Sequence, residues 1–312
     1  MNNKNTDYHL IIIGGGPAGC AAAVYAARKK IRSAIIADDW GGQSVVSNDV
    51  QNWIGETHIS GIDIAKNLQA HIREYADDVL DIVEDTKVVS LRHDGEVFAV
   101  ETNTNNRMTT RAVLVCSGAR RRVLDVEGAE RLNHKGISYC ASCDAPLFKG
   151  LDVVVVGGGN AGFESALQLL EYAPNVYLFE RGSQFRADSI TIDKALQHPN
   201  MKAFTDVSLK KIEGEHKVEG VVYSQNQGGD TSLPVGGVFV EIGSLPNSEF
   251  MPENITLNER NEIVVDPKTQ RTNVSGVWAA GDVSDGLFRQ NNISMGDAVK
   301  ALEDIYLWLH KN

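Results

Sequence analysis

Short apolar runs separated by glycine-rich turns organise the start of the chain. The run at residues 9–13 ends at three consecutive glycines, which predicts a buried parallel strand. Residues 17–30 are rich in alanine, begin with proline and end with three cations, and each of these features favours a helix. Residues 33–37 form the next apolar run. The pattern therefore predicts a strand, a tight turn, a helix and a second strand.

The same order of elements returns in the middle of the chain. An apolar run at 151–156 leads into three more glycines, residues 163–172 have helical spacing, and 175–179 have the pattern of the following strand. A repeat at this distance predicts two related nucleotide-binding domains rather than a short-period repeat protein. Both domains would carry a parallel central sheet, so the expected fold class is α/β with two Rossmann-like units.

Less regular patterns fill the rest of the chain. Residues 86–91 and 96–101 have strand-like character and predict a β-meander, and 111–117 has the composition of a buried strand. Apolar runs at 237–242 and 276–280 predict further strands. The last helix is expected at 293–310, where one face carries Ala298, Ala301, Leu302, Ile305 and Leu309.

Composition and charge exclude several classes of function. The 312 residues are 42% hydrophobic and 23% charged, which is typical of a globular protein of about two domains. The formal net charge of −11 argues against nucleic acid or an anionic membrane as the main partner. No apolar run approaches the roughly 20 residues of a membrane span, and no secretory signal is visible. We therefore expect a cytoplasmic protein.

A glycine pattern typical of dinucleotide sites follows the first predicted strand. Gly14, Gly16 and Gly19 form G-x-G-x-x-G between that strand and the first helix. Glycine permits a tight turn and a close approach to a pyrophosphate, which the helix N-terminus attracts. An acidic residue about 20 positions later is expected at the ribose hydroxyls. Asp38 and Asp39 stand there, so the segment predicts a dinucleotide site.

A second glycine pattern has equal context. Its glycines are Gly157, Gly159 and Gly162. Glu180 ends the next predicted strand, where a carboxylate accepts hydrogen bonds from the adenosine 2′-hydroxyl and repels a 2′-phosphate, which favours NADH over NADPH. Arg181 and Arg186 act in the opposite direction, since either guanidinium could pair with a phosphate. Two intact patterns indicate one site for FAD and one for a nicotinamide.

Two of the four cysteines form Cys-x-x-Cys at Cys140 and Cys143. This spacing lets a disulfide form across one helical turn, and a helix N-terminus would activate one thiol. Asp144 adjoins the pair and could relay protons. A zinc site would need further ligands nearby, and inert buried thiols are the default interpretation of Cys20 and Cys116. Between two cofactor motifs, a redox-active disulfide is the favoured interpretation of Cys-x-x-Cys.

Taken in order, these motifs resemble the low-molecular-weight thioredoxin reductase family. The resemblance rests on residues 14–19, 41–43, 140–144, 157–162 and 279–282, with Asn52, Arg289 and Gln290. Residues 144–150 and 237–243 are closer to the flavoprotein subunit of alkyl hydroperoxide reductase, which is NADH-linked. Glu180 fits that flavoprotein too, because thioredoxin reductases usually carry His-Arg-Arg where this chain has Glu-Arg-Gly.

The resemblance implies two three-layer ββα domains, the second inserted in the first. The FAD-binding domain would comprise residues 1–117 and 246–312, and the nicotinamide domain, 118–245, would carry the Cys-x-x-Cys. The residues expected at FAD are Gly14, Gly16, Pro17, Ala18, Gly19, Asp38, Gly42, Gln43, Asn52, Gly118, Gly281, Asp282, Arg289 and Gln290. Those expected at the nicotinamide nucleotide are Gly157, Gly159, Asn160, Ala161, Gly162, Glu180, Arg181, Arg186 and Gly243. Family members are homodimers, so a homodimer is expected.

The activity implied by the resemblance is reduction of a protein disulfide. Electrons would pass from the nicotinamide through FAD to Cys143, Asp144 would protonate the released thiolate, and Cys140 would attack the partner's disulfide. The crossings between domains, near 119–122 and 245–247, are the expected hinges of a domain rotation. Because the chain starts directly at the FAD strand, without the thioredoxin-like folds of the peroxide-reductase flavoprotein, we expect a separate thioredoxin-like or glutaredoxin-like partner.

Two other functions fit part of the pattern. A flavin-dependent dithiol oxidase would pass electrons from a small dithiol to oxygen, but such enzymes tend to lose the second glycine pattern, which is intact here. A nucleotide-responsive flavoprotein without catalytic turnover would bind the cofactors alone. Flavoproteins that reduce ferredoxin or a quinone lack the dithiol, which disfavours that class.

Overall fold

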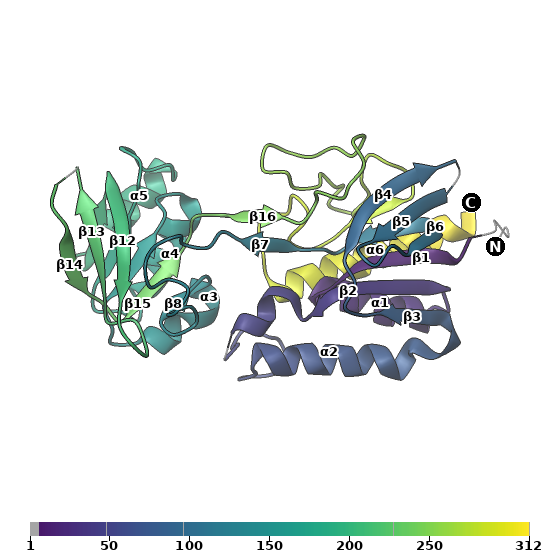
Figure 1. Ribbon diagram of the computed structural model, residues 1–312, viewed down its shortest axis with the longest axis horizontal. Helices are drawn as coiled ribbons and strands as arrows, with labels where there is room; N and C mark the ends of the chain where they lie inside the picture. Colours follow the sequence, from purple (N-terminus) through teal and green to yellow (C-terminus); the bar gives the residue numbers. More distant parts are fainter. Residues whose placement is uncertain (1–5, 48, 96, 227, 312) are drawn as a thin grey trace. The chain divides into compact units, whose positions relative to one another are not determined.

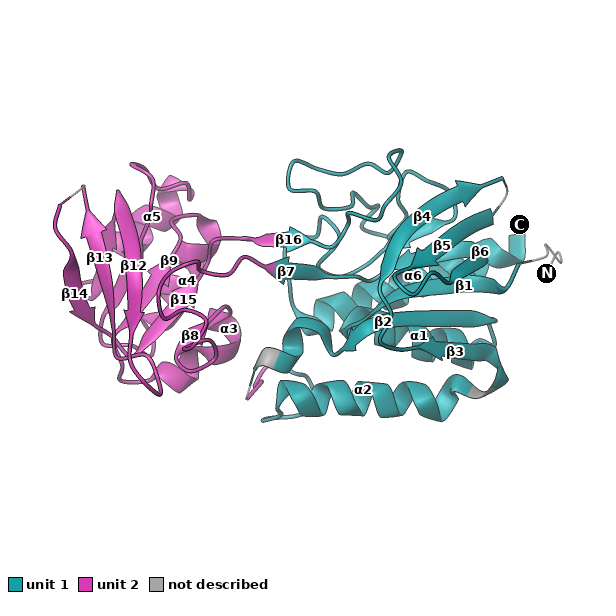
Figure 2. Ribbon diagram, viewed as in Figure 1, with its two compact units in different colours: residues 1–48, 53–120, 245–312 teal, residues 49–52, 121–244 magenta. Residues whose placement is uncertain are grey.

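The computed structural model describes residues 6–47, 49–95, 97–226 and 228–311. Two compact units divide the chain, one of residues 1–48, 53–120 and 245–312, the other of 49–52 and 121–244 (Figure 2). The boundaries therefore fall after residues 120 and 244, whereas the sequence analysis placed them after 117 and 245. Residue 96, the expected start of a strand, and residues 1–5 of the expected FAD domain lie outside the described residues.

A parallel sheet forms the centre of the first unit, in the order β3-β2-β1-β6 (Figure 1). Strand β17 pairs with β6 on its other side. The strands of this sheet are β1 (Tyr8–Gly15), β2 (Ser33–Trp40), β3 (Leu80–Val83), β6 (Arg107–Val115) and β17 (Val277–Ala279). The predicted strand at 111–117 thus begins and ends earlier. Gly118, with a φ of 65°, turns the chain shortly after β6.

The antiparallel strands β4 (Val88–Asp94) and β5 (Val97–Thr102) continue from the first half of β6 as a meander. Ile11, Ile13 and Val113 of the parallel strands share a buried cluster with Phe98 and Val100 of β5. The alternation of strand side chains directs these residues toward the meander. The first unit therefore has a β layer on one face of its parallel sheet.

Helices complete the first unit. They are α1 (Pro17–Arg28), η1 (Gly42–Val46), α2 (Gly61–Ala76), η2 (Asp77–Val79) and α6 (Asn291–Lys311). Helix α1 packs against α6 and α2. It ends two residues before the predicted position because Lys30 adopts a left-handed φ of 55°. The apolar face predicted for the last helix is buried, as expected.

The second unit repeats this architecture. Its parallel sheet has the order β11-β10-β9-β15-β8, and a separate antiparallel sheet has the order β12-β13-β14. The parallel strands are β8 (Ile137–Ser138), β9 (Val153–Val156), β10 (Val176–Phe179), β11 (Met201–Phe204) and β15 (Gly237–Val240). The other elements are α3 (Ala141–Asp144), η3 (Ala145–Phe148), α4 (Asn160–Leu169), α5 (Ser189–Leu196), β12 (Val207–Glu213), β13 (Gly220–Gln225) and β14 (Thr231–Pro234).

Alternate residues of β9 pack against the two different layers that cover the parallel sheet of this unit. Val153 and Val155 pack with Phe163 of α4, whereas Val154 packs with Val207 and Val221 of the antiparallel sheet. The fold class predicted from the sequence, α/β with parallel Rossmann-like sheets, is confirmed.

The two chain crossings between the units pair with each other as β7 (Ala119–Arg121) and β16 (Ser244–Pro246). The backbone N–H of Asn247 donates to the carbonyl of Gly118 at 2.9 Å, and that of Arg122 donates to the carbonyl of Gly243 at 3.1 Å. Gly118 and Gly243 both have positive φ values, of 65° and 92°. A paired ribbon with a glycine near either end therefore connects the units.

Candidate functional sites

Both predicted glycine turns have the same local geometry. Gly14 has a φ of 117°, and a Cβ there would overlap the carbonyl oxygen of Cys116, which follows β6. Gly157 has a φ of 126°, and a Cβ there would overlap the carbonyl oxygen of Glu241, which follows β15. Only glycine fits such a turn, because it combines a positive φ with a neighbouring backbone in contact. In both units the chain therefore passes from the first parallel strand to the helix through the same kind of glycine turn.

The third glycine of each pattern lets the helix approach the turn. A Cβ on Gly19 would overlap the carbonyl oxygen of Gly14, and one on Gly162 would overlap that of Gly157. The middle glycine differs, because no described atom lies within 4 Å of a Cβ on Gly159, and one on Gly16 would meet only Gly42 Cα, at 3.9 Å. The protein itself leaves these middle positions open, as a site for a pyrophosphate requires.

The helices that follow the turns present unused backbone donors. The N-cap of α1 is Gly16 and that of α4 is Gly159, and neither helix has a side-chain cap or an acidic residue in its first turn. Pro17 occupies the first position of α1, where its lack of an N–H costs nothing. Such helix ends combine free N–H groups with a partial positive charge. Both therefore fit the phosphates of a dinucleotide.

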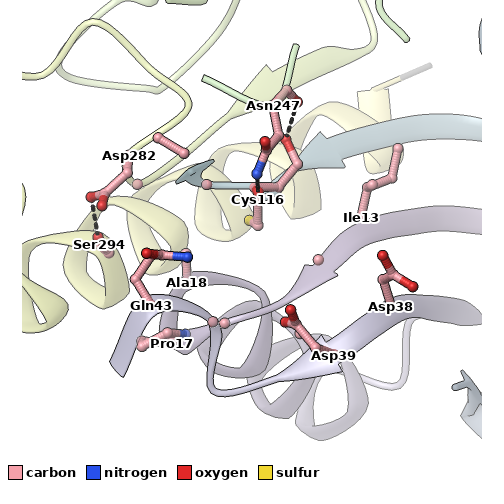
Figure 3. A pocket seen from close by; sticks show the side chains of 18 of the residues that line it. Ile13, Pro17, Ala18, Asp38, Asp39, Gln43, Cys116, Asn247, Asp282 and Ser294 are labelled. Atoms are coloured by element: carbon pink, nitrogen blue, oxygen red, sulfur yellow. Dashed lines mark hydrogen bonds between the residues drawn. The ribbon is translucent and has the colours of Figure 1, made fainter. Parts of the chain in front are cut away.

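A cavity at the glycine turn of the first unit collects ten of the fourteen residues predicted for FAD (Figure 3). They are Gly14, Gly16, Pro17, Ala18, Asp38, Gly42, Gln43, Gly118, Gly281 and Asp282. Figure 3 shows Asp38 and Asp39 at one end and Asp282, which accepts a hydrogen bond from Ser294 at 3.4 Å, at the other. The cavity thus follows the carboxyl edge of the parallel sheet, where an extended dinucleotide binds in such folds.

Four predicted FAD residues do not line this cavity. Gly19 contacts the turn itself, and Asn52 belongs to the short segment grouped with the second unit. Arg289 pairs with the buried carboxylate of Glu262. The carbonyl of Gln290 accepts a hydrogen bond from the N–H of Ser294, in the first turn of α6. The structure therefore does not place these four residues at the cavity wall.

Several wall residues carry no signal in the sequence. Cys116, Asn247 and Ser294 line the cavity although they come from three distant segments. Asn247 is fixed by two hydrogen bonds with Ser117, one from its side-chain amide at 2.8 Å and one to its own carbonyl at 2.7 Å. Residues from distant segments line the same cavity only after the strands have assembled, so no local motif predicts them.

The acidic position near the end of the second parallel strand, β2 in the first unit and β10 in the second, differs between the units. Ile13 pairs with Ile36, and Val156 pairs with Phe179, so the residue that matches Glu180 in register is Ala37. A Cβ on Gly15 would lie 2.8 Å from that of Ala37, as one on Gly158 would lie 2.7 Å from that of Glu180. Asp38, predicted at this position from sequence spacing, stands one residue farther on. Its carboxylate still reaches the cavity wall.

Glu180 is the organising side chain of the second glycine turn. Its carboxylate accepts the backbone N–H of Gly158 at 2.8 Å and that of Gly182 at 2.7 Å. Arg186 lies 3.5 Å away, and the Glu180 side chain is only 6% exposed. Burial acts to raise the pKa of Glu180, but the two backbone donors and Arg186 outweigh burial and hold the pKa below its usual range. A buried anion therefore stands beside this turn.

A cavity in the second unit brings four predicted nicotinamide residues together. They are Gly157, Glu180, Arg181 and Arg186. Arg122 and Ser208 also line it, from the first crossing and from β12. The other five predicted residues, Gly159, Asn160, Ala161, Gly162 and Gly243, are not in its wall. Asn160 instead binds Asp188, donating from its amide nitrogen at 3.1 Å and accepting the Asp188 N–H at 2.8 Å.

Cys140 and Cys143 form a disulfide with a Cα–Cα distance of 5.3 Å. Cys140 is the N-cap of α3, and its carbonyl accepts the N–H of Cys143 at 3.3 Å and that of Asp144 at 3.0 Å. The Asp144 carboxylate in turn accepts the hydroxyl of Ser138 at 2.7 Å. Both sulfur-bearing residues are partly exposed. The predicted helical turn therefore carries a disulfide beside a carboxyl group.

The remaining cysteines are buried thiols. The Cys20 thiol donates to the carbonyl of Gly15 at 3.3 Å, and burial raises its pKa to about 12. Burial, with a smaller effect of Cys20, also raises the pKa of Cys116. Thiols with raised pKa values are poor nucleophiles. Within the described ranges there is no cluster of side chains that could hold a metal ion, and no helix long and apolar enough to cross a membrane.

Comparisons with known proteins agree with this geometry. A family model described as pyridine nucleotide-disulphide oxidoreductase matches residues 8–301. The F subunit of alkyl hydroperoxide reductase from Pseudomonas aeruginosa is 36% identical over 296 residues, which cover 94% of this chain and 57% of that protein. The Escherichia coli protein of the same name is 36% identical over 301 residues, covering 96% of this chain and 58% of that protein. The chain thus spans less than two thirds of these relatives.

Solved structures match over nearly the full length of both chains. Thioredoxin reductase from Streptococcus pyogenes has a TM-score of 0.90 and 32% identity, covering 99% of this chain and 100% of that one. Thioredoxin reductase from Giardia duodenalis has a TM-score of 0.90 and 30% identity, covering 97% and 99%. Paired glycine turns, a disulfide on a helical turn and these matches lead to one assignment. The chain belongs to the pyridine nucleotide-disulphide oxidoreductase family.

Proposed function

We propose that this protein is an NAD(P)H-dependent FAD enzyme that reduces the disulfide of a thioredoxin-like or glutaredoxin-like protein. The observation that carries the proposal is one chain with two equivalent glycine turns and a disulfide at Cys140 and Cys143. Two dinucleotide sites are the minimum for hydride transfer between a nicotinamide and a flavin. The disulfide gives the electrons an exit toward another protein.

FAD is assigned to the first unit and the nicotinamide nucleotide to the second. The first cavity runs from Asp38, past the open position at Gly16, to Asp282, and so offers room for an extended ligand. The N–H groups of the first turn of α1 would hold its pyrophosphate. Bound there, FAD would relay two electrons from the reduced nicotinamide to the disulfide. The predicted domains, 1–117 with 246–312 and 118–245, remain proposals as cofactor-binding domains.

Glu180 supports a preference for NADH. Its carboxylate is held charged beside the turn by two backbone donors and would repel a 2′-phosphate. Arg186 already pairs with this carboxylate at 3.5 Å, so the positive charge that Arg186 could offer to a 2′-phosphate is partly neutralised. Arg181 lines the same cavity and acts in the opposite direction. The balance favours NADH because the anion is buried, whereas the Arg186 side chain is 76% exposed and screened by water.

The dithiol residues receive separate roles. Cys143 is proposed to accept electrons first and Cys140 to attack the partner's disulfide, after which Cys143 resolves the mixed disulfide. Asp144 would protonate the thiolate released when the internal disulfide opens. The dithiol and the nicotinamide cavity belong to the same unit, so they would reach the flavin in turn. Residues 119–122 and 245–247, in the paired crossings, are the proposed hinges.

A homodimer is also proposed. Large apolar side chains stand exposed on the first unit, with Leu287 at 90%, Phe288 at 70% and Ile54 at 81% exposure. Leu287 and Phe288 adjoin in the chain, and neighbouring exposed apolar side chains can form part of a partner surface. Light scattering coupled to size-exclusion chromatography tests the proposal, and a monomer at micromolar concentration would contradict it.

The test of the function is anaerobic mixing with NADH. Cys143→Ser should keep nicotinamide-driven bleaching of the flavin but lose reduction of a thioredoxin or glutaredoxin disulfide. Cys20→Ser is the matched control, because that thiol is buried outside the disulfide, does not line the first cavity, and serine can keep its hydrogen bond to the carbonyl of Gly15. Full redoxin turnover by Cys143→Ser would overturn the proposal. Bleaching without turnover in the wild-type protein would favour a non-catalytic flavoprotein, and fast oxygen consumption with a small dithiol would favour an oxidase.

A further inference from the structure

We infer that Ser138 is a positioning residue for the proton transfer that opens the Cys140–Cys143 disulfide. This inference rests on the proposed function and adds a group that no motif in the sequence marks. Ser138 lies at the end of β8, pairs in register with Phe239 of β15, and is only 4% exposed. Its hydroxyl therefore starts from a fixed point on the central sheet of the second unit.

The Ser138 hydroxyl joins the backbone of the dithiol turn to the acid beside it. It accepts the backbone N–H of Cys140 at 3.2 Å and donates to Oδ2 of Asp144 at 2.7 Å. A hydroxyl carries one proton, so accepting the N–H leaves that proton for the carboxyl group. Successive hydrogen bonds polarise one another, and the N–H therefore strengthens the bond to Asp144.

These two hydrogen bonds determine which oxygen of Asp144 carries the proton that is transferred. Because Oδ2 accepts the Ser138 proton, a proton that Asp144 delivers must be carried on Oδ1. Without Ser138, Oδ2 of Asp144 would lose this donor, and the bond would no longer orient the carboxyl group toward the dithiol turn. The N-cap residue Cys140 would also lose the bond that ties its N–H to the sheet. Ser138 thus orients the acid and the disulfide relative to one another through one hydroxyl.

Reduction of the Cys140–Cys143 disulfide to two thiols consumes two electrons and two protons. The bond between the two sulfur atoms breaks, and the pair of sulfurs takes up two electrons in total. These electrons originate from NADH, which becomes NAD⁺. NADH delivers those electrons with one proton as hydride, and solvent supplies the second proton. Asp144 Oδ1 transfers a proton to the released thiolate and is reprotonated from solvent. Ser138 exchanges no atom in this sequence and acts only through Asp144 and Cys140.

The test follows the enzyme's own disulfide and needs no partner protein. FAD-loaded enzyme is mixed anaerobically with NADH, quenched with N-ethylmaleimide, and scored by mass spectrometry for labelled Cys140 and Cys143. Ser138→Ala should slow the appearance of thiols about tenfold, because the lost hydrogen bond would stabilise the negative charge that Asp144 gains as its proton leaves. The rate of flavin reduction by NADH should stay within about twofold, because that step precedes the disulfide.

A double-mutant cycle separates positioning from a general structural role. Asp144→Asn should slow thiol appearance at least as much, and adding Ser138→Ala to it should cost little more. Ser138→Thr, which keeps the hydroxyl, should restore most of the rate, and Ser224→Ala is the control for losing another buried hydroxyl in the same unit. If Ser138→Ala does not fold, Ser138→Cys, with similar volume and a weaker donor, takes its place.

Each outcome has a definite meaning. Unchanged thiol appearance in Ser138→Ala, or fully additive effects with Asp144→Asn, would overturn the role of Ser138. If instead NADH reduces the flavin of the wild-type enzyme but no thiols ever appear, the proposed function itself fails. The two failures are distinguishable because the wild-type reaction is measured in the same experiment.

Discussion

Replacement of Glu180 by glutamine tests the organisation of the second glycine turn. The carboxylate accepts the N–H of Gly158 at 2.8 Å on one oxygen and that of Gly182 at 2.7 Å on the other. Glutamine has nearly the same volume, but one of its two terminal groups is a donor. One backbone N–H would then face an NH₂ group in a site that is only 6% exposed. Glu180→Gln therefore breaks one bond and weakens the other.

The expected cost follows from these two bonds. A hydrogen bond to a charged group is worth about 1.5–3 kcal/mol, and a buried unsatisfied donor costs about 1–3 kcal/mol. We therefore expect Glu180→Gln to destabilise the second unit by about 2–3 kcal/mol. Because the same turn is proposed to bind the nucleotide, kcat/KM for NADH should fall at least about tenfold, equivalent to about 1.4 kcal/mol. The value for NADPH should fall less, because repulsion of its 2′-phosphate is removed.

Rapid mixing and thermal unfolding measure both effects. Flavin reduction is followed with NADH and with NADPH, and Glu171→Gln serves as the control, because Glu171 is an exposed glutamate just beyond α4. Since the pKa of Glu180 is depressed, its contribution to stability is present above its ordinary pKa and is lost as pH falls through the depressed value. Because glutamine does not titrate, Glu180→Gln should not show this loss of stability as the pH falls. An unchanged NADH to NADPH ratio together with an unchanged unfolding midpoint would refute the reasoning.

Three further perturbations follow from the geometry. Gly159→Ala should keep the unfolding midpoint but abolish nicotinamide binding in a fluorescence titration, because its Cβ meets no described atom and would enter the space proposed for the pyrophosphate. Gly162→Ala should instead prevent folding of the second unit, since its Cβ overlaps the carbonyl of Gly157, and a folded variant with normal circular dichroism would contradict this. Burial raises the pKa of Glu241, against the hydrogen bond from Ser165 at 2.7 Å. The folded unit therefore holds this proton more tightly than the unfolded chain, and its stability falls as pH rises above the ordinary glutamate pKa. Glu241→Gln should flatten that decline and raise the midpoint at pH 8, and an unchanged slope would count against it.

The sequence by itself determined the features that depend on local constraints. The strand, turn and helix around Gly14 and around Gly157 were predictable because only glycine combines a positive φ with contact to a neighbouring strand. The disulfide was predictable because Cys-x-x-Cys brings two thiols together within a single helical turn. The buried face of the last helix followed from its period, since residues three and four apart share one side.

Only the tertiary structure decided which residues from distant segments meet. Register showed that Ala37, not Asp38, matches Glu180, because pairing between strands sets that position and spacing along the chain does not. Asn247 reaches the first cavity from beyond the inserted unit. Ser138 is close to the dithiol in sequence, yet its role depends on the pairing of β8 with β15, which fixes where its hydroxyl points. Long-range contacts of this kind leave no periodic or compositional signal, because they arise only when the sheets assemble.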